Sequence, residues 1–397
     1  MASLLRSLRA DPTFIDKVTR WEVIPDRASV SHPFPVDLHP GIQNGLERQG
    51  IHKLFHHQIS TYKAVRNGSN VCLVTPSASG KTLSYNIPIV QSLIEFSDFS
   101  AMYIFPTKAL AHDQIYTIKN FISETGNDIP AYSFDGDSVQ SSKNVIRNTG
   151  RIILTNPDML HIGILPKHTQ WRRFFSGLQF IVIDELHIYR GFFGSHFSNL
   201  IRRLKRIVKF YGGKPQFICC SATIGNPHEL SREIIGDESI LIDNDGSPKG
   251  EKHFLMYNPP YKQGRNNIGP NLVDEASEIA FRLLKNRLKT IFFFRTRSNV
   301  ELFGNSLRRR IKDSRNFDLY EMVATYRGGY LPHERRNIEN AFRKGEILCV
   351  ASTNALELGI DIGELDASVI VGFPGTIASC WQQAGRSGRT SSVSLSI

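Results

Sequence analysis

The chain of 397 residues is poor in cysteine and contains no long apolar run. Its five cysteines include no C-x-x-C pair, which argues against a zinc site and against a disulfide framework. No run approaches the roughly 18 apolar residues that a membrane span needs, and the N-terminus lacks the apolar core of a secretory signal. These absences favour a protein of the cytoplasm, where thiols stay reduced, with no membrane as a partner.

The first residues carry a weaker signal. Met1 to Arg9 is rich in arginine, serine and leucine, and no acid precedes Asp11. This composition faintly resembles a transit peptide. We expect a short surface helix instead, at the start of an N-terminal extension that covers residues 1–40.

The overall composition is that of a folded protein, because 41% of the residues are apolar and 21% are charged. The length exceeds the usual size of one hydrophobic core and therefore predicts two domains. A formal net charge of +11 favours a polyanionic partner, and nucleic acid is the commonest one. A basic surface that only keeps the protein soluble would give the same charge, so this signal needs support from motifs.

Short apolar runs alternate with segments of helical period along the chain. Continuous runs of valine, isoleucine and phenylalanine between helices are typical of parallel strands that are buried on both faces. In the first half, strands are expected at Val71 to Val74, Ala101 to Phe105, Arg151 to Leu154, Phe180 to Ile183 and Gln216 to Cys220, with helices at Leu110 to Ser123 and Ser195 to Lys209.

The alternation stops at Asn258 to Pro270, a segment rich in proline, glycine and asparagine that is typical of a linker. It then resumes, with strands expected at Thr290 to Phe294, Leu319 to Ala324, Ile347 to Ala351 and Ala367 to Gly372. The pattern predicts two α/β domains with doubly wound parallel sheets. We expect the first domain at residues 41–257, the linker at 258–270 and the second domain at 271–397.

The segment Thr75 to Thr82 (TPSASGKT) follows an apolar strand and precedes a helical segment, which is the context of a phosphate-binding loop. In such a loop, backbone N–H groups and the helix N-terminus face the phosphates of ATP. Lys81 would reach the terminal phosphates and the hydroxyl of Thr82 would ligate Mg²⁺. Thr75 replaces the first glycine of the general pattern. The residues expected to contact the nucleotide are Ser77, Ala78, Ser79, Gly80, Lys81 and Thr82.

Paired acids, Asp184 and Glu185, follow the apolar strand FIVI in the segment DELH. At a strand end, Asp184 would hold the metal ion and Glu185 would orient or deprotonate the attacking water. A solvated strand end is the structural alternative, and the upstream phosphate loop disfavours it. His187 either couples this site to Ser221-Ala222-Thr223 on the next strand or fills a polar niche.

Residues 382–389 read QQAGRSGR and carry Arg386 and Arg389, three positions apart, which places both guanidinium groups on one side of a helical turn. Aimed across a cleft between the two domains, they would neutralise charge on the transferring phosphoryl group. A solvated basic turn is the alternative.

The ordered set of motifs resembles that of superfamily 2 helicases of the DEAD/DEAH-box type. The resemblance implies two RecA-like domains, hydrolysis of ATP with Mg²⁺ between them, adenine recognition by Gln58, and a nucleotide site that includes Asp361 and Gln382. The further segments that carry it are Phe105 to Gln114 (motif Ia), Thr155 to Asp158 (Ib), Ser221 to Thr223 (III), Phe292 to Asn299 (IV) and Ser352 to Asp361 (V).

The wording of several segments, among them DELHIYRGFFGSH and TNALELGIDIGELDA, is similar to the MrfA or YprA type of DNA-repair helicase, often described as RecQ-like. This likeness implies translocation on single-stranded DNA from 3′ to 5′ in a bacterial-type, nucleoid-associated protein. Only eight residues follow Arg389, so we expect the last strand of the second domain and a cysteine-bearing C-terminal region to be missing.

The family's motifs Ia, Ib, IV and V line a groove that contacts the phosphate backbone without reading bases. By position, the expected nucleic-acid contacts are Thr107, Lys108, Thr155, Arg295 and Thr353. The basic helix with Arg202, Arg203, Lys205, Arg206 and Lys209, and the cluster Arg308 to Arg310, are each either a solvated face or a DNA contact.

Two functions remain open at this point. The first is a nucleic-acid-stimulated ATPase with translocase or helicase activity. The second is a protein that binds nucleic acid and ATP but cannot couple them, because its second domain is cut short.

Overall fold

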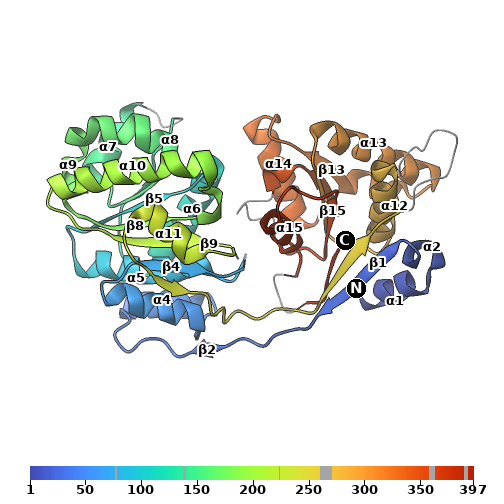
Figure 1. Cartoon of the computed structure of the whole chain (residues 1–397), viewed down its shortest axis with the longest axis horizontal. Coiled ribbons are helices and arrows are strands. Elements are labelled where there is room, and N and C mark those ends of the chain that lie inside the picture. Colours follow the sequence, from blue (N-terminus) through green and yellow to red (C-terminus); the bar gives the residue numbers. More distant parts are fainter. Residues whose placement is uncertain (77, 137–139, 223, 260–270, 357–362, 389–391) are drawn as a thin grey trace. The chain divides into compact units, whose positions relative to one another are not determined.

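The computed structural model describes residues 1–76, 78–136, 140–222, 224–259, 271–356, 363–388 and 392–397. The chain divides into two compact units (Figure 1). The central unit comprises residues 29–247, and the composite unit combines residues 1–28 with residues 248–397. In the described residues, no helix is both long enough and apolar enough to cross a membrane.

The central unit is built on a seven-stranded sheet in the order β10-β4-β9-β8-β5-β7-β6, in which every pair of neighbours is parallel. Parallel neighbours place all carboxyl ends at one edge. The strands are β4 (Val71–Val74), β5 (Ser100–Ile104), β6 (Ala131–Ser133), β7 (Ile152–Thr155), β8 (Leu178–Ile183), β9 (Gln216–Ser221) and β10 (Ile240–Ile242); β2 (Ser31–His32) and β3 (Leu54–Phe55) form a separate antiparallel pair.

Helices cover this sheet on both sides, with α4 and α5 opposite α7, α8 and α10 (Figure 1). One apolar core, which includes Trp171, Phe174 and Phe197, fills the space between the sheet and α10. The helices are α3 (Pro40–Arg48), α4 (His56–Arg66), α5 (Lys81–Glu95), α6 (Lys108–Glu124), α7 (Gln140–Thr149), α8 (Pro157–Met159), η1 (Leu160–Ile164), η2 (Leu165–Trp171), α9 (Arg172–Ser176), η3 (Leu186–Ile188), α10 (Gly191–Phe210) and α11 (Pro227–Ile235).

The composite unit has a second seven-stranded sheet, in the order β1-β11-β16-β15-β12-β14-β13. Only β1 is antiparallel to its neighbour among the pairs described. Its strands are β1 (Val18–Ile24), β11 (Lys252–Tyr257), β12 (Thr290–Phe294), β13 (Val323–Tyr326), β14 (Cys349–Ser352), β15 (Ala367–Val371) and β16 (Ser394–Ser396). Its helices are α1 (Ala2–Ala10), α2 (Pro12–Ile15), α12 (Leu272–Lys285), α13 (Arg297–Asp313), η4 (Phe317–Met322), α14 (Pro332–Lys344), η5 (Asn354–Leu356) and α15 (Ile377–Ala384). The prediction of two α/β domains with parallel sheets is confirmed.

The N-terminal residues belong to the composite unit and do not form a separate extension. Leu4, Leu5 and Leu8 of α1 are buried in the same core as Leu283 and Leu307. The expected surface helix therefore exists but packs three leucines into the core. Its leucine spacing of three and four residues places them on one face of the helix.

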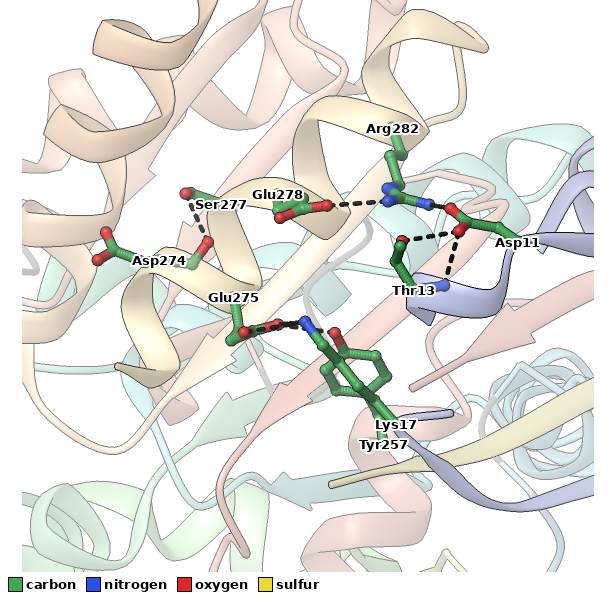
Figure 2. A network of polar contacts seen from close by, with 9 residues as sticks. All are labelled: Asp11, Thr13, Lys17, Tyr257, Asp274, Glu275, Ser277, Glu278 and Arg282. Atoms are coloured by element: carbon green, nitrogen blue, oxygen red, sulfur yellow. Dashed lines mark hydrogen bonds and ion pairs between the residues drawn. The ribbon is translucent and has the colours of Figure 1, made fainter. Parts of the chain in front are cut away.

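A polar network fastens the N-terminal segment to α12 (Figure 2). Arg282 donates to the Asp11 carboxylate, and Lys17 Nζ lies 2.8 Å from Glu275 Oε2. The Thr13 hydroxyl, which donates to Asp11, and then Arg282 lower the pKa of the Asp11 carboxyl group to about 2. Segments far apart in the sequence are thus joined by charged groups as well as by the core.

The predicted domain boundaries differ from the observed ones. The chain passes between the units at residues 28–29 and again at 247–248, not within 258–270. Strand β11, assigned by the prediction to the first domain, lies in the second sheet, where Trp21 faces Leu255. Of the predicted linker, residues 260–270 lie outside the described residues.

The last strand was expected to be missing, but the described residues that follow Arg389 include a strand, β16. Strand β16 lies between β11 and β15 in the sheet. Serine dominates this strand, and only Leu395 contributes a large apolar side chain to the core. Its hydroxyl-rich sequence explains why the apolar pattern misses it: Ser368 and Ser396 are bonded to each other inside the sheet, with their oxygens 3.1 Å apart.

Candidate nucleotide site and nucleic-acid surface

The phosphate-binding loop connects β4 to the N-terminus of α5. Two of its residues have positive φ angles, 61° at Ala78 and 87° at Gly80. Gly80 is the N-cap of α5 and has no side chain to satisfy the first backbone N–H groups of the helix. The N-terminus of α5 is therefore built to accept an anion. Ser77 lies outside the described residues.

Lys81 opens α5 and points back into its own loop. Its ammonium donates to the carbonyl oxygens of Thr75 at 2.7 Å and Pro76 at 2.9 Å. The hydroxyls of Thr75 and Ser79 lie 2.6 Å apart across the same loop. These bonds fix the loop in a tight curve around the lysine.

Gln58 connects α4 to the loop. Its side-chain oxygen accepts from the Phe55 backbone N–H at 2.8 Å, and its amide nitrogen donates to the Gly80 carbonyl oxygen at 3.3 Å. A Cβ atom at Gly80 would lie 2.7 Å from that amide nitrogen, so the contact requires glycine as well as the positive φ. The predicted adenine contact of Gln58 stays a prediction, and the structure places the residue against the loop.

Asp184 and Glu185 follow β8 at the carboxyl edge of the sheet. Burial and the neighbouring Glu185 carboxylate raise the pKa of the Asp184 carboxyl group well above its ordinary value, while the Glu185 backbone N–H and Lys81 oppose the shift. That N–H donates to Asp184 Oδ1 at 2.8 Å, and Glu185 itself has a φ of 51°. The strained turn concentrates two carboxylates in one place.

His187 contacts Ser221, which belongs to the segment named in the sequence analysis, and also Glu185. Its Nδ1 lies 3.4 Å from the Ser221 hydroxyl and 3.5 Å from a Glu185 carboxylate oxygen. Burial lowers the pKa of the His187 ring. The Thr75 backbone N–H donates to the Ser221 carbonyl oxygen at 3.4 Å. A chain of contacts thus runs from the phosphate loop through β9 to the paired acids.

The donors at this edge fit a hard divalent cation. Carboxylate and hydroxyl oxygens are the ligands that Mg²⁺ prefers, and Asp184 and Thr82 supply both kinds. A raised carboxyl pKa is what an excess of negative charge in a recessed place produces, and a cation would relieve it. The described residues contain no cluster of three or more His, Cys, Asp or Glu side chains that could hold a metal without a nucleotide.

The predicted site residues of the composite unit follow β15. Gln382 and Arg386 are buried, and Arg386 is 2% exposed. Gln382 lies on α15, and Arg386 lies just beyond its end. Arg389 and Asp361 lie outside the described residues. The finger role of the two arginines therefore stays a prediction.

The predicted nucleic-acid contacts divide into two groups. Lys108, Thr107 and Arg295 are exposed at the carboxyl ends of β5 and β12, and Thr353 is half-buried after β14. Thr155 is fully buried and its hydroxyl donates to the Phe134 carbonyl oxygen at 2.9 Å. Thr155 is thus buried at the end of β7, which ends one residue later than expected, and its contact with nucleic acid stays a prediction.

The sequence reasoning missed His57, which is fully buried beside Gln58. Its Nδ1 lies 3.7 Å from Asp245, and the Gly246 backbone N–H donates to the same atom at 3.4 Å. Asp245 lies just before the second passage of the chain between the units. In the sequence, the doublet His56-His57 was the only signal that could have drawn attention to His57, and it does not indicate Asp245 as the partner.

Comparison with known proteins agrees with this arrangement. The family model described as DEAD/DEAH box helicase matches residues 55–230, and the model described as helicase conserved C-terminal domain matches residues 274–391. The ATP-dependent helicase YprA of Bacillus subtilis is 46% identical over 393 residues, which cover 99% of this chain and 52% of YprA. The ATP-dependent helicase HRQ1 of Saccharomyces cerevisiae is 38% identical, over 99% of this chain and 37% of HRQ1.

A crystal structure of the helicase MrfA bound to DNA and AMPPNP matches with a TM-score of 0.93 and 45% identity, over 100% of this chain and 54% of that one. The chain thus spans about half the length of YprA and MrfA. The two family models and the relatives agree with one another. The chain belongs to the superfamily 2 helicases of the DEAD/DEAH-box type, with the MrfA and YprA proteins among its relatives.

Proposed function

We propose that this chain is the ATP-hydrolysing motor of a DNA helicase or translocase that moves from 3′ to 5′ on single-stranded DNA and serves DNA repair. The observation that carries the proposal is the grouping of a phosphate loop, a lysine and two carboxylates at one edge of the central sheet. The DNA-bound structures of MrfA support DNA as the strand.

In this mechanism the loop and the N-terminus of α5 hold the phosphates of ATP, and Lys81 exchanges its bonds to the loop carbonyls for bonds to phosphate oxygens. Thr82 and Asp184 would hold Mg²⁺, which supplies neutralisation of phosphate charge when bound. Glu185 accepts a proton from the attacking water or orients it. The contact of His187 with Ser221 would transmit the state of this site to the rest of the sheet.

Grip on the strand would come from Thr107, Lys108, Arg295 and Thr353, which lie at strand ends of the two sheets. Such contacts to phosphate and sugar hold a strand without reading its sequence. Arg386 and Arg389 would supply positive charge to the transferring phosphoryl group.

One observation favours the second candidate, a protein that binds ATP and nucleic acid without coupling them. Arg386 is buried, whereas a finger arginine has to reach the nucleotide. The earlier reason for this candidate is weaker, because the residues that follow Arg389 include strand β16 of the composite sheet.

ATPase rates with and without single-stranded DNA separate the two candidates. We expect stimulation by DNA in the parent chain and its loss in Arg386→Ala, since a finger arginine contributes about a thousandfold or more. Arg6→Ala, at an exposed position of α1, is the control. Because Arg386 is buried, a thermal melt must show that Arg386→Ala is folded. Absence of stimulation in the parent chain would favour the uncoupled protein.

Displacement of streptavidin from biotinylated oligonucleotides tests the direction of movement. A motor that moves from 3′ to 5′ displaces streptavidin from the 5′ end when ATP is present and leaves it on the 3′ end. The opposite result would refute the proposed polarity. An RNA oligonucleotide of the same sequence shows whether DNA is preferred.

A further inference from the structure

A hollow of about 290 Å³ opens on the central unit between α8 and η1 on one side and α10 on the other. Its walls include Phe193, His196 and Arg203 of α10, His161 of η1, and Pro157 and Asp158 of α8. This volume is at the small end of the range for ligand pockets, so it suits one flat ring better than a larger molecule.

The apolar wall of the hollow includes Phe193 and Phe197, which belong to a group of stacked aromatic rings. The ring of Tyr189, which is buried, is stacked with Phe197 at 3.9 Å between centroids and with Phe193 at 5.6 Å. The interplanar angles are 15° and 20°, so the three rings are nearly parallel. Phe193 is 42% exposed. Another flat ring placed on Phe193 would continue the stack.

Polar groups line the other walls. The Arg203 guanidinium lies 2.7 Å from His161 Nδ1, and since a guanidinium only donates, that nitrogen accepts and the ring proton is on Nε2. His161 thus presents an N–H donor. The Asp158 carboxylate is an acceptor in the same hollow. Donor and acceptor together match the edge of a nucleobase, which carries both kinds of group.

The positive charge of α10 favours a polyanionic ligand. The helix contains five basic residues and no acidic one, and of the five only Lys205 forms an ion pair in the described part of the chain, with Asp237. Arg202 is bonded to the neutral side chain of Asn199, which also lines the hollow, at 2.9 Å. Arg206 is exposed one turn beyond Arg203. Cations without carboxylate partners therefore flank the hollow.

We infer that this hollow is a base-binding pocket, in which one base of a single-stranded nucleic acid stacks on Phe193 while Arg202 and Arg206 contact the flanking phosphates. The inference rests on the proposed function and adds a subsite to it. Base stacking on aromatic side chains with nearby cations is how proteins hold single strands with little preference for sequence. The basic helix that the sequence left undecided is then a DNA contact.

The test uses the full chain and an oligothymidylate in which a single 2-aminopurine is moved from position to position. In the parent, one position should change its emission on binding, because a stacked 2-aminopurine is quenched. Phe193→Leu keeps the apolar volume and removes the ring. Phe210→Ala is the control, since this phenylalanine is 77% exposed at the far end of the same helix.

Phe193→Leu and Phe193→Ala should abolish that emission change and weaken binding by about fivefold to a hundredfold, the range measured for single stacking contacts. Phe210→Ala should bind like the parent. If Phe193→Ala does not fold, His196→Ala and Phe193→Leu give the answer, because His196 is exposed.

Parent-like binding by the Phe193 variants, or an equal loss in Phe210→Ala, would overturn the pocket and leave the proposed function intact. A parent chain that binds no oligonucleotide would refute the proposed function and the pocket with it. A parent chain that binds the oligonucleotide without a change in 2-aminopurine emission at any position would also overturn the inference, because no base would then be stacked in the hollow.

Discussion

The ammonium of Lys81 lies 2.7 Å from the carbonyl oxygen of Thr75, at the start of the loop that Lys81 ends. The lysine therefore shapes its own loop as well as facing the phosphate position. Removing the ammonium should disturb both. We expect Lys81→Ala to lower ATP turnover by about a hundredfold or more, as loss of a preorganised charge-stabilising donor does in other enzymes. A steady-state ATPase assay checks this, with Lys63→Ala on the exposed face of α4 as the control. Turnover near that of the parent would show that Lys81 does not act in ATP hydrolysis.

Glu185→Gln should separate binding from hydrolysis. The amide keeps the size of the side chain and cannot accept a proton from water. We expect the affinity for a fluorescent ATP analogue to stay within a few fold of the parent while turnover is lost. Loss of nucleotide affinity would instead mean that the bond of the Glu185 backbone to Asp184, and the strained turn around it, depend on the carboxylate.

Binding to single-stranded DNA should weaken steeply as salt rises, because contacts to phosphates release counterions. Lys108→Ala should weaken binding to two unrelated oligonucleotides equally and reduce the slope of log affinity against log salt by about 0.7. Lys119→Ala, on the same helix, is the control. Dissociation constants at four salt concentrations decide the matter. A salt response of Lys108→Ala equal to that of the parent would exclude Lys108 from the surface.

Leu8→Ala should destabilise the composite unit although it alters the first turns of the chain. Leu8 is 3% exposed in the core shared with α12, and removing a buried leucine side chain typically costs about 2–5 kcal/mol. Leu302→Ala on the exposed face of α13 should change the free energy of unfolding by about 0.5 kcal/mol or less. Hydrogen exchange in α12 measures the effect. Unchanged protection in Leu8→Ala would mean that the N-terminal segment docks without stabilising the unit.

The stability of the central unit should fall as pH decreases from about 6.5 to 4. Burial lowers the pKa of His57 from 6.5 to about 4, and Asp245 only partly opposes this. The unfolded state therefore binds more protons than the folded state in that window, so acid favours unfolding. Between pH 7 and pH 5 the parent should lose free energy of unfolding. We expect this loss to be smaller in His57→Gln by on the order of 1–2 kcal/mol. Denaturant unfolding of parent and variant at both pH values measures the difference. Equal losses would show that His57 is protonated in the folded state.

The central strands could be predicted because their apolar runs are continuous. Val71 to Val74 and Thr290 to Phe294 agree with the observed bounds of β4 and β12. The prediction at Leu319 to Ala324 was displaced, since Leu319 is buried from a 3₁₀ helix and the strand begins at Val323. A local apolar pattern indicates that a segment is buried, but it does not distinguish a buried 3₁₀ helix from a buried strand.

The edge of the second sheet could not be predicted from local pattern. Strand β1 is mostly exposed, and it is defined by its pairing with β11, where Val23 faces His253. A partner so distant in the sequence leaves no periodic signal in either segment. The candidate residues of the nucleotide site were easier to find, because the phosphate loop and the paired acids are local motifs. Both follow parallel strands of one sheet, so they lie at the same edge of that sheet. His57 and Thr155 depend on neighbours that only the fold supplies.

The composite unit imposes an order on folding during synthesis. The central unit is one continuous stretch and can fold as soon as residue 247 has left the ribosome. The N-terminal segment, with its three buried leucines, is made first but has no partner until β11, α12 and β16 follow. At about 5–20 residues per second, an apolar helix stays uncovered for roughly 20–80 seconds. The newly made chain should therefore expose α1 to chaperones throughout this interval. Replacing Leu4, Leu5 and Leu8 by polar residues would reduce this exposed apolar surface, but it would also weaken the core of the folded composite unit.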